Sequence, residues 1–135
     1  MPLPPLKCIS IILCERVYRI EATPGNLMII NAFHALSIPK FPCMFGTITV
    51  LYTVTEGHGT YDMVLSLVDA RTGREVKNWK DKYRVTDPLT VGDVQMILHD
   101  VPLPEPGKYL FELKCNDDLI SSRPFYVNPQ KKRQR

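Results

Sequence analysis

Residues 47–67 read TITVLYTVTEGHGTYDMVLSL, and this stretch decides the fold. Between residues 48 and 54 every second side chain is apolar, and most of the residues between them are threonine. The same period of two returns at residues 61–67, after a loop that contains two glycines. Side chains on a β-strand point alternately to the two faces of a sheet, and a short glycine-containing loop between two strands is typical of a hairpin. The stretch therefore predicts a hairpin with one face in a core.

The rest of the chain is divided into segments of similar length. Twelve prolines and seven glycines interrupt the sequence, and such residues mark the turns between strands. Residues 109–115 and 125–127 carry apolar side chains in one phase around the turn residues 116–118, which predicts a second core hairpin. We predict further strands at residues 8–20, 27–36 and 91–101.

Residues 74–85 carry two conflicting patterns. Val76, Trp79 and Tyr83 are three and four residues apart, as on one face of a helix, whereas Trp79, Asp81 and Tyr83 also share the parity of a strand. We favour an edge strand over a short helix, because exposed charge at an edge discourages pairing with another chain. The basic residues of this segment from Lys77 onward are Lys77, Lys80, Lys82 and Arg84.

These segments amount to seven or eight strands and leave no place for the helical crossovers of a parallel sheet. We predict an all-β fold, an antiparallel two-layer β-sandwich of the immunoglobulin-like or jelly-roll-like kind. A chain of 135 residues is the usual size of one domain, and 23% charged with 44% hydrophobic residues is typical of a globular protein. We expect one sandwich domain at residues 1–128 and a basic, flexible tail at residues 129–135.

Short motifs along most of the chain resemble a known family. These motifs are Leu13-Cys14-Glu15, Gly25-Asn26, Asn31-x-Phe33 and the Pro-Gly-Lys-Tyr of residues 106–109. In these features the chain resembles a group of small bacterial proteins classified as a domain of unknown function. The resemblance implies a bacterial β-sandwich, and it implies no activity and no site residues.

The N-terminal sequence predicts a cytoplasmic protein. The apolar run at residues 9–13 is too short to cross a bilayer and is a poor match to a secretion signal, so we expect no membrane contact. The four cysteines are then expected to be reduced, and no pair has Cys-x-x-Cys spacing.

The net charge of +3 arises mainly in residues 71–84 and in the tail. The domain therefore lacks the broad basic field of nucleic-acid-binding proteins.

Residue types used in catalysis are present but scattered. No Gly-x-Ser-x-Gly elbow occurs, and the Gly-x-Gly at residues 57–59 lacks the third glycine and the helix of a phosphate loop. Nothing in the sequence brings His58 to His99. We therefore predict no catalytic residue, no metal and no cofactor, and no enzymatic activity. The side chains that would suit a metal are His58, Tyr61, Asp62, His99 and Asp100.

The predicted function is that of a non-enzymatic protein-interaction or accessory module, whose partner is another protein or a second copy of the chain. One alternative is binding of a small molecule or carbohydrate by end loops, and another is a metal-assisted enzyme. Residues 71–84 also have the composition of a single-strand nucleic-acid surface, but core packing and edge protection explain it better. The candidate surface comprises His58, Tyr61, Trp79, Tyr83, Lys77, Lys80 and Lys82.

Overall fold

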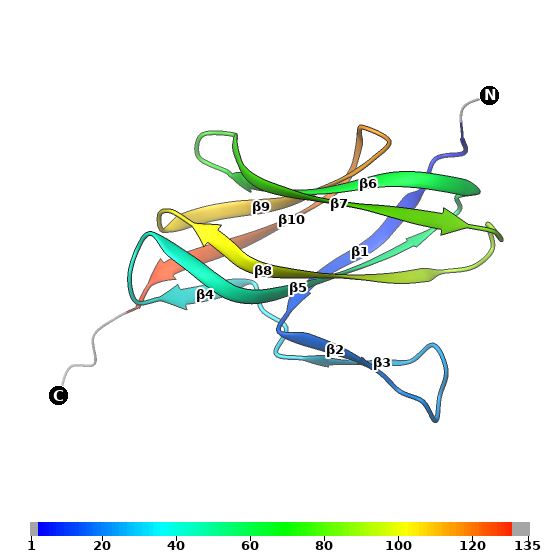
Figure 1. The fold of residues 1–135 in the computed structure, drawn as a ribbon, viewed down its shortest axis with the longest axis horizontal. Coiled ribbons are helices and arrows are strands. Elements are labelled where there is room, and N and C mark those ends of the chain that lie inside the picture. Colours follow the sequence, from blue (N-terminus) through cyan, green and yellow to red (C-terminus); the bar gives the residue numbers. More distant parts are fainter. Residues whose placement is uncertain (1–2, 131–135) are drawn as a thin grey trace.

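The computed structural model describes residues 3–130, and these form ten β-strands and no helix (Figure 1). The all-β prediction is confirmed. Between residues 3 and 130 there is no helix with the length and apolarity that a membrane crossing requires. The basic residues of the predicted tail, 131–135, lie outside the described residues. The strands are β1 (Lys7–Cys14), β2 (Arg16–Arg19), β3 (Leu27–Ile30), β4 (Ala35–Ile38), β5 (Cys43–Thr55), β6 (Gly59–Asp69), β7 (Arg74–Val85), β8 (Gly92–Leu103), β9 (Gly107–Cys115) and β10 (Asp118–Pro129).

Within the described chain the strands pair into three sheets. One has the order β1-β5-β8, another has the order β4-β10-β9-β6-β7, and β2 with β3 makes a two-stranded ribbon. Every pair is antiparallel except β4 with β10, which run parallel. The prediction of a purely antiparallel fold is wrong at this pair. Because most of the chain separates β4 from β10, no hairpin constrains their relative direction.

Residues 47–67 form two strands, but these strands do not form the predicted hairpin. β5 pairs with β1 and β8, while β6 pairs with β7 and β9 in the larger sheet. The intervening loop, with positive φ at Glu56 and Gly59, carries the chain from one sheet to the other. Alternation shows which side chains are buried. Two strands with the same alternation can be neighbours in one sheet, or they can lie in different sheets that share a core.

The described chain has ten strands, not seven or eight, because two predicted strands are each divided. Residues 8–20 break at Glu15 into β1 and β2, and residues 27–36 break into β3 and β4. Asn31, at the second break, has a φ of 53°, a left-handed conformation in which asparagine is enriched. As a result, β2 and β3 leave the main body as a projecting ribbon (Figure 1).

The edge-strand prediction for residues 74–85 is confirmed. β7 lies at one end of the larger sheet and pairs there with β6. The register shifts beside Val76, since Leu67 is opposite Lys77 but Val68 is opposite Glu75. One extra residue reverses the phase of the strand, so Val76 and Trp79 both pack against the core although they are three residues apart. This bulge explains the helix-like spacing in the sequence.

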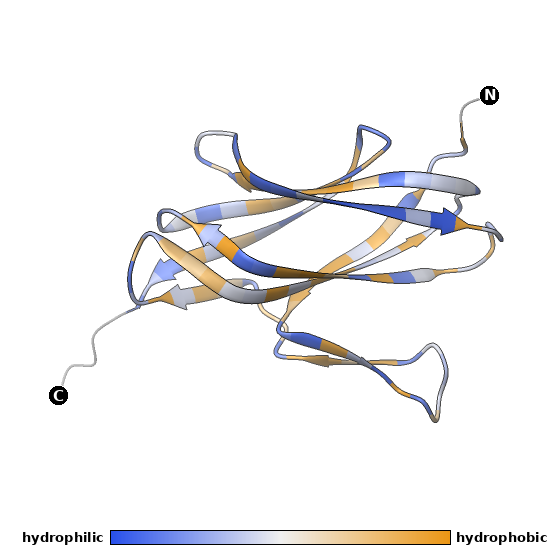
Figure 2. Ribbon diagram, in the orientation of Figure 1, coloured by the Kyte–Doolittle hydropathy of each residue, from blue (hydrophilic) through white to orange (hydrophobic). Residues whose placement is uncertain are grey.

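The two larger sheets bury one continuous apolar core, and Figure 2 shows hydrophobic residues recurring along the strands of both sheets. The larger sheet contributes a row of aromatic rings to it. Phe125 stacks on Tyr109 and on Phe111, with ring centroids 5.7 and 5.1 Å apart, and Trp79 lies 6.4 Å from Phe111. The largest fully buried side chains of the core are Tyr52, Tyr61, Tyr109, Phe111, Phe125, Leu13, Ile48, Met63, Leu65, Leu67, Leu98 and Leu103.

A second, smaller cluster attaches the ribbon to the body. Leu51 of β5 points away from the main core and packs with Cys14 of β1 and Val17 of β2. Ile12 and Leu27 cover the edges of this cluster. The middle of β5 is therefore buried on both faces. The threonine-rich pattern of this strand did not predict that.

Candidate functional site

Tyr61, a predicted surface residue, is buried in the core. Its hydroxyl accepts a hydrogen bond from the backbone N–H of His58 at 2.9 Å and donates one to the carbonyl of Pro4. Tyr61 therefore ties the β5–β6 loop to the N-terminal segment. Its ring is not a platform for a ligand. The signal in the sequence was the apolar phase that Tyr61 shares with Met63 and Leu65.

His58 and His99 lie at opposite ends of β5. His99 is opposite Thr47, and its Nδ1 is 3.3 Å from the Thr47 hydroxyl oxygen. His58 follows Thr55 in the loop at the other end of the strand. Eight residues of extended strand span about 26 Å. The fold therefore separates the two histidines on which the metal-assisted alternative depends.

Trp79 and Tyr83 are partly buried and pack against the core. The Trp79 ring lies against Phe111 on one side, and the Lys77 ammonium sits 5.4 Å from its centroid. The Tyr83 hydroxyl fills the space beside Gly92, where a Cβ atom would be 1.7 Å away from it. Both aromatic side chains therefore help to join β7 to the rest of the body, and little of either ring is open to a ligand.

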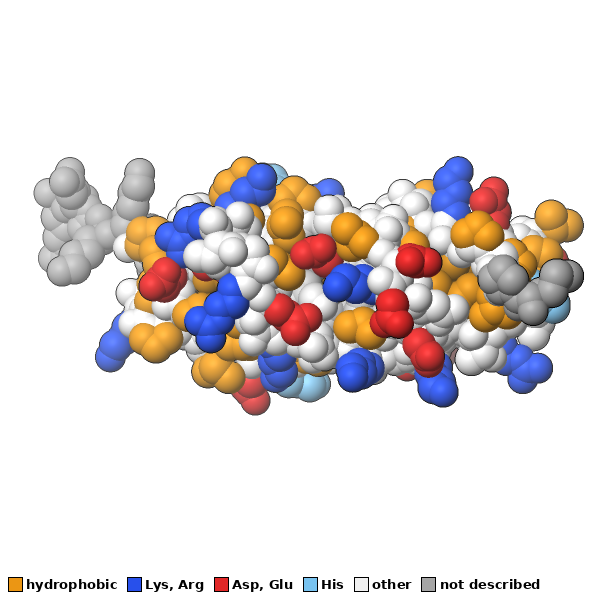
Figure 3. All heavy atoms as spheres, turned by 90° about the horizontal axis from the view of Figure 1, so that it is seen from above, with side chains coloured by type: hydrophobic (Ala, Val, Ile, Leu, Met, Phe, Trp, Pro, Cys, Tyr) orange, Lys and Arg blue, Asp and Glu red, His pale blue; other side chains and the backbone are white. Residues whose placement is uncertain are grey.

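Lys80 and Lys82 point outward from β7, in the opposite phase to Trp79. Lys82 is 3.8 Å from the carboxylate of Asp62, but both side chains are more than 70% exposed, so the pair contributes little to stability. Basic and acidic side chains are both present on the face seen in Figure 3. Lys80 and Lys82 have Asp62 and Asp81 as acidic neighbours, as expected for edge protection.

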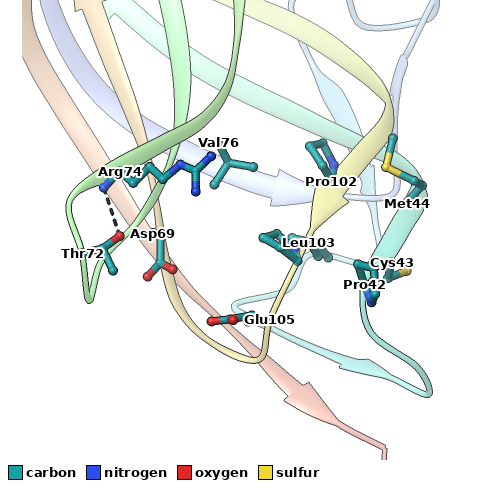
Figure 4. Close-up of a pocket in the computed structure, with 11 residues that line it drawn as sticks. Pro42, Cys43, Met44, Asp69, Thr72, Arg74, Val76, Pro102, Leu103 and Glu105 are labelled. Atoms are coloured by element: carbon teal, nitrogen blue, oxygen red, sulfur yellow. Dashed lines mark hydrogen bonds between the residues drawn. The ribbon is translucent and has the colours of Figure 1, made fainter.

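A pocket of about 580 Å³ lies at the end of the body away from His58. The start of β5 and the end of β8 meet the β8–β9 loop, the β6–β7 turn and the start of β7 here (Figure 4). One wall is apolar and rich in proline, and the facing elements carry charged and hydroxyl groups. The lining residues are Pro42, Cys43, Met44, Asp69, Thr72, Arg74, Val76, Pro102, Leu103, Pro104 and Glu105.

Arg71 holds the two carboxylates at the rim of this pocket. Its guanidinium is 3.4 Å from Asp69 and 2.8 Å from Glu105. The Asp69 carboxylate also accepts the backbone N–H of Arg71 at 3.0 Å. Hydrogen bonding from the Arg71 backbone, together with the Arg71 side chain, lowers the pKa of Asp69 below its usual 3.8. Asp69 therefore stays ionised and paired.

The lowered pKa of Asp69 predicts a specific acid sensitivity. Because the folded pKa is below the unfolded value, the stabilisation is complete well above pH 4 and is lost as the pH falls through the folded pKa. Asp69→Asn should cost about 1 kcal/mol at pH 7 and should flatten the loss of stability between pH 5 and pH 2. Urea unfolding at several pH values measures both effects. Asp117→Asn, in the exposed β9–β10 turn, is the control, and a slope as steep in Asp69→Asn as in wild type would contradict the prediction.

The second surface feature is the outward face of the ribbon. Arg16 is opposite Ile30 and Tyr18 is opposite Met28, so these four side chains share one face. Tyr18 is 46% exposed and Met28 is 51% exposed. The guanidinium of Arg16 donates to the Tyr18 hydroxyl at 2.9 Å and lies 5.8 Å from the centre of its ring. The opposite face of the ribbon carries Val17, which packs on Leu51.

Neither feature was found from the sequence. Residues 8–20 and 27–36 showed apolar side chains on both phases, which suggested strands covered on both faces. In the structure Val17 and Leu27 of one phase pack on the body, whereas Ile29 of that phase is 37% exposed and Tyr18, Met28 and Ile30 of the other phase are exposed. The pocket brings together four segments that are far apart in the chain, and no local pattern marks such a meeting point.

The described residues thus define a small all-β protein with a projecting apolar ribbon and a pocket at one end. The chain belongs to a family of unknown function, DUF6941, whose model matches residues 9–128. The resemblance seen in the short motifs to a domain of unknown function is confirmed.

Comparison with solved structures gives a similarity of fold. Pseudomonas fluorescens alkylpurine DNA glycosylase AlkC, bound to DNA containing an abasic site analog, matches with a TM-score of 0.53 and 13% sequence identity. The match covers 91% of this chain and 30% of the glycosylase chain, so this protein corresponds to less than a third of that enzyme. We found no curated protein whose sequence matches this one.

Proposed function

We propose that the chain is a non-enzymatic protein-interaction module, built as a two-layer β-sandwich, whose projecting ribbon docks on a partner protein. The exposed face formed by Arg16, Tyr18, Met28 and Ile30 carries the proposal. The ribbon gains most of its stability from the face that packs on the body, and the cross-strand pairs on the other face contribute less and leave apolar surface exposed to solvent. Tyrosine, methionine and arginine are the types enriched in protein interfaces.

The charge of this face indicates the chemistry of the partner. β2 and β3 contain arginine and no acidic residue. A two-fold contact between two copies of this face would bring two Arg16 guanidinium groups into one interface without a carboxylate from either face. A different protein, with an apolar patch bordered by aspartate or glutamate, complements the face better. The partner is therefore an acidic protein surface, not a second copy.

Nucleic acid is the less supported partner. The basic and aromatic composition of residues 71–84 favours it, and the chain shares a fold with part of a DNA-bound glycosylase. However, Trp79 is packed between Phe111 and Lys77, so its faces are not free to stack on bases. Asp81 lies between Lys80 and Lys82 in the sequence of β7, and Lys82 is 3.8 Å from the carboxylate of Asp62, which weakens attraction to phosphates. A cytoplasmic location and a bacterial origin stay predictions.

Interaction of the ribbon face is tested by affinity purification from the native host with three baits. We expect wild type and Tyr126→Ser to retain the same partner, because Tyr126 is an equally exposed tyrosine on β10. The double variant Tyr18→Ser, Met28→Ser should lose it. With purified partner, each central side chain should change the affinity by about 30-fold, as for an interface hot spot. Arg16→Glu should weaken binding, and a partner variant with lysine in place of its facing carboxylate should restore it.

Two results would contradict the proposal. One is a partner that the double variant retains with unchanged affinity. The other is a stable dimer of the chain, seen by size-exclusion chromatography with light scattering, that the double variant dissociates. The second result would show that the ribbon face binds another copy of the same chain.

A further inference from the structure

The pocket at the end of the body is lined by two carboxylates and one guanidinium group, those of Asp69, Glu105 and Arg74. Asp69 and Glu105 are both paired with Arg71, which is not one of the lining residues. No carboxylate of residues 3–130 forms an ion pair with Arg74, the other arginine at this end. The Arg74 side chain extends over the pocket toward Val76 (Figure 4). The carboxylates are thus already satisfied, and one guanidinium is available to a ligand.

The wall across from Arg74 is apolar and shaped by restrained backbone. Pro42, Pro102 and Pro104 line it, and Leu103 between the last two is fully buried. Met44 is 62% exposed and completes the wall at the mouth of the pocket. Proline cannot change its φ, and the paired strands β5 and β8 fix the rest of the wall. The wall is therefore largely formed before any ligand binds, which reduces the entropy cost of binding.

We propose that this pocket binds a small organic carboxylate with an aliphatic or aromatic body. The carboxylate would receive two parallel N–H bonds from the planar guanidinium of Arg74. The apolar body would lie against Pro42, Met44 and Pro102. A volume of about 580 Å³ falls within the range of small-molecule sites. The hydroxyl of Thr72 accepts the backbone N–H of Arg74 at 3.2 Å and keeps its own hydrogen for a second ligand oxygen.

Other ligand chemistries fit this pocket less well. A cation would need free carboxylates, and both are engaged by Arg71. An inorganic anion would use Arg74 but would leave the apolar wall without a contact. A neutral apolar molecule would use the wall but would cover the Arg74 guanidinium without replacing its hydrogen bonds to water. The proposal is independent of the ribbon face, which lies on other strands.

Titration of ¹⁵N-labelled protein with sodium octanoate tests the site directly. We expect the amide signals of Met44, Arg74, Val76 and Leu103 to shift and to saturate. Octanol, which has the same body without the charge, and acetate, which has the charge without the body, should each bind about tenfold more weakly or not measurably. Saturable shifts confined to β2 and β3 would overturn the proposal, as would equal binding of octanol and octanoate.

Variants then measure separately how much Arg74 and the apolar wall contribute to octanoate binding. Arg74→Gln should weaken octanoate binding about tenfold, and Lys80→Gln, an exposed neutralisation on the same strand, should leave it unchanged. Met44→Glu places a carboxylate at the open mouth of the pocket and should abolish binding without disturbing a buried side chain. Urea unfolding of each variant checks that it is folded. Unchanged octanoate affinity in folded Arg74→Gln or Met44→Glu would overturn the assignment.

Discussion

Replacing Phe111 with alanine is expected to lower the free energy of unfolding by about 3–5 kcal/mol, the largest effect of any single truncation considered for this protein. Phe111 is fully buried in the middle of β9. Its ring stacks on Phe125 at 5.1 Å and lies against Trp79 at 6.4 Å. Removal of the ring loses its own burial and leaves a cavity that its aromatic neighbours cannot fill without leaving their rotamers. The loss is comparable to much of the net stability of an ordinary domain.

Urea unfolding followed by circular dichroism measures this loss, provided that the slope of the transition is unchanged. Tyr126→Ala is the matched control, because Tyr126 is an aromatic residue in the same sheet that is 47% exposed. It should cost less than about 1 kcal/mol. If the two variants lost similar stability, the aromatic row would not be the centre of the core.

Leu51→Ala is expected to have the second largest effect, with a loss of about 2–4 kcal/mol. Leu51 is buried, but it faces away from the main core and contacts Cys14 and Val17. Because this small cluster joins the ribbon to the body, the variant should loosen β2 and β3 more than the rest of the protein. Amide hydrogen exchange should therefore accelerate in the ribbon at conditions where β6 and β9 stay protected.

Ile97→Ala controls for this prediction. Ile97 lies on β8, on the same side of the sheet as Thr49, but it is 56% exposed. Its truncation should leave the exchange of the ribbon unchanged. Protection of β2 and β3 that survives in Leu51→Ala would show that backbone hydrogen bonds, such as that from Glu15 N–H to the Ile30 carbonyl, hold the ribbon without the cluster.

The strands themselves followed from local patterns, and their pairing did not. Alternation located β5, β6, β9 and much of β10, because burial on one face of a strand leaves a period of two in the sequence. The same alternation led to a wrong prediction of a hairpin at residues 47–67, because the two strands belong to different sheets. The pattern also predicted β1 and β2 as one strand, because the residues on both sides of the break at Glu15 are largely apolar.

The exposure of the predicted surface residues could not be predicted from the sequence either. Tyr61, Trp79 and Tyr83 were candidates because aromatic residues serve equally in cores and in binding sites, and the structure places all three in contact with the core. Tyr18 and Met28, in contrast, lie in segments that had the appearance of buried strand. Composition identifies what a side chain can do, whereas exposure depends on which neighbours the fold brings over it.

By itself the sequence determined the all-β class, the edge character of residues 74–85, the β9–β10 hairpin and the family. These properties depend on neighbouring residues, whose spacing is fixed by the geometry of one strand. The tertiary structure alone decided that β5 and β6 belong to different sheets and that β4 runs parallel to β10. It also decided that the ribbon exposes Tyr18 and that Arg74 lines the same pocket as three prolines. These properties depend on contacts between distant segments, and side-chain alternation along one strand carries no information about which other strand lies beside it.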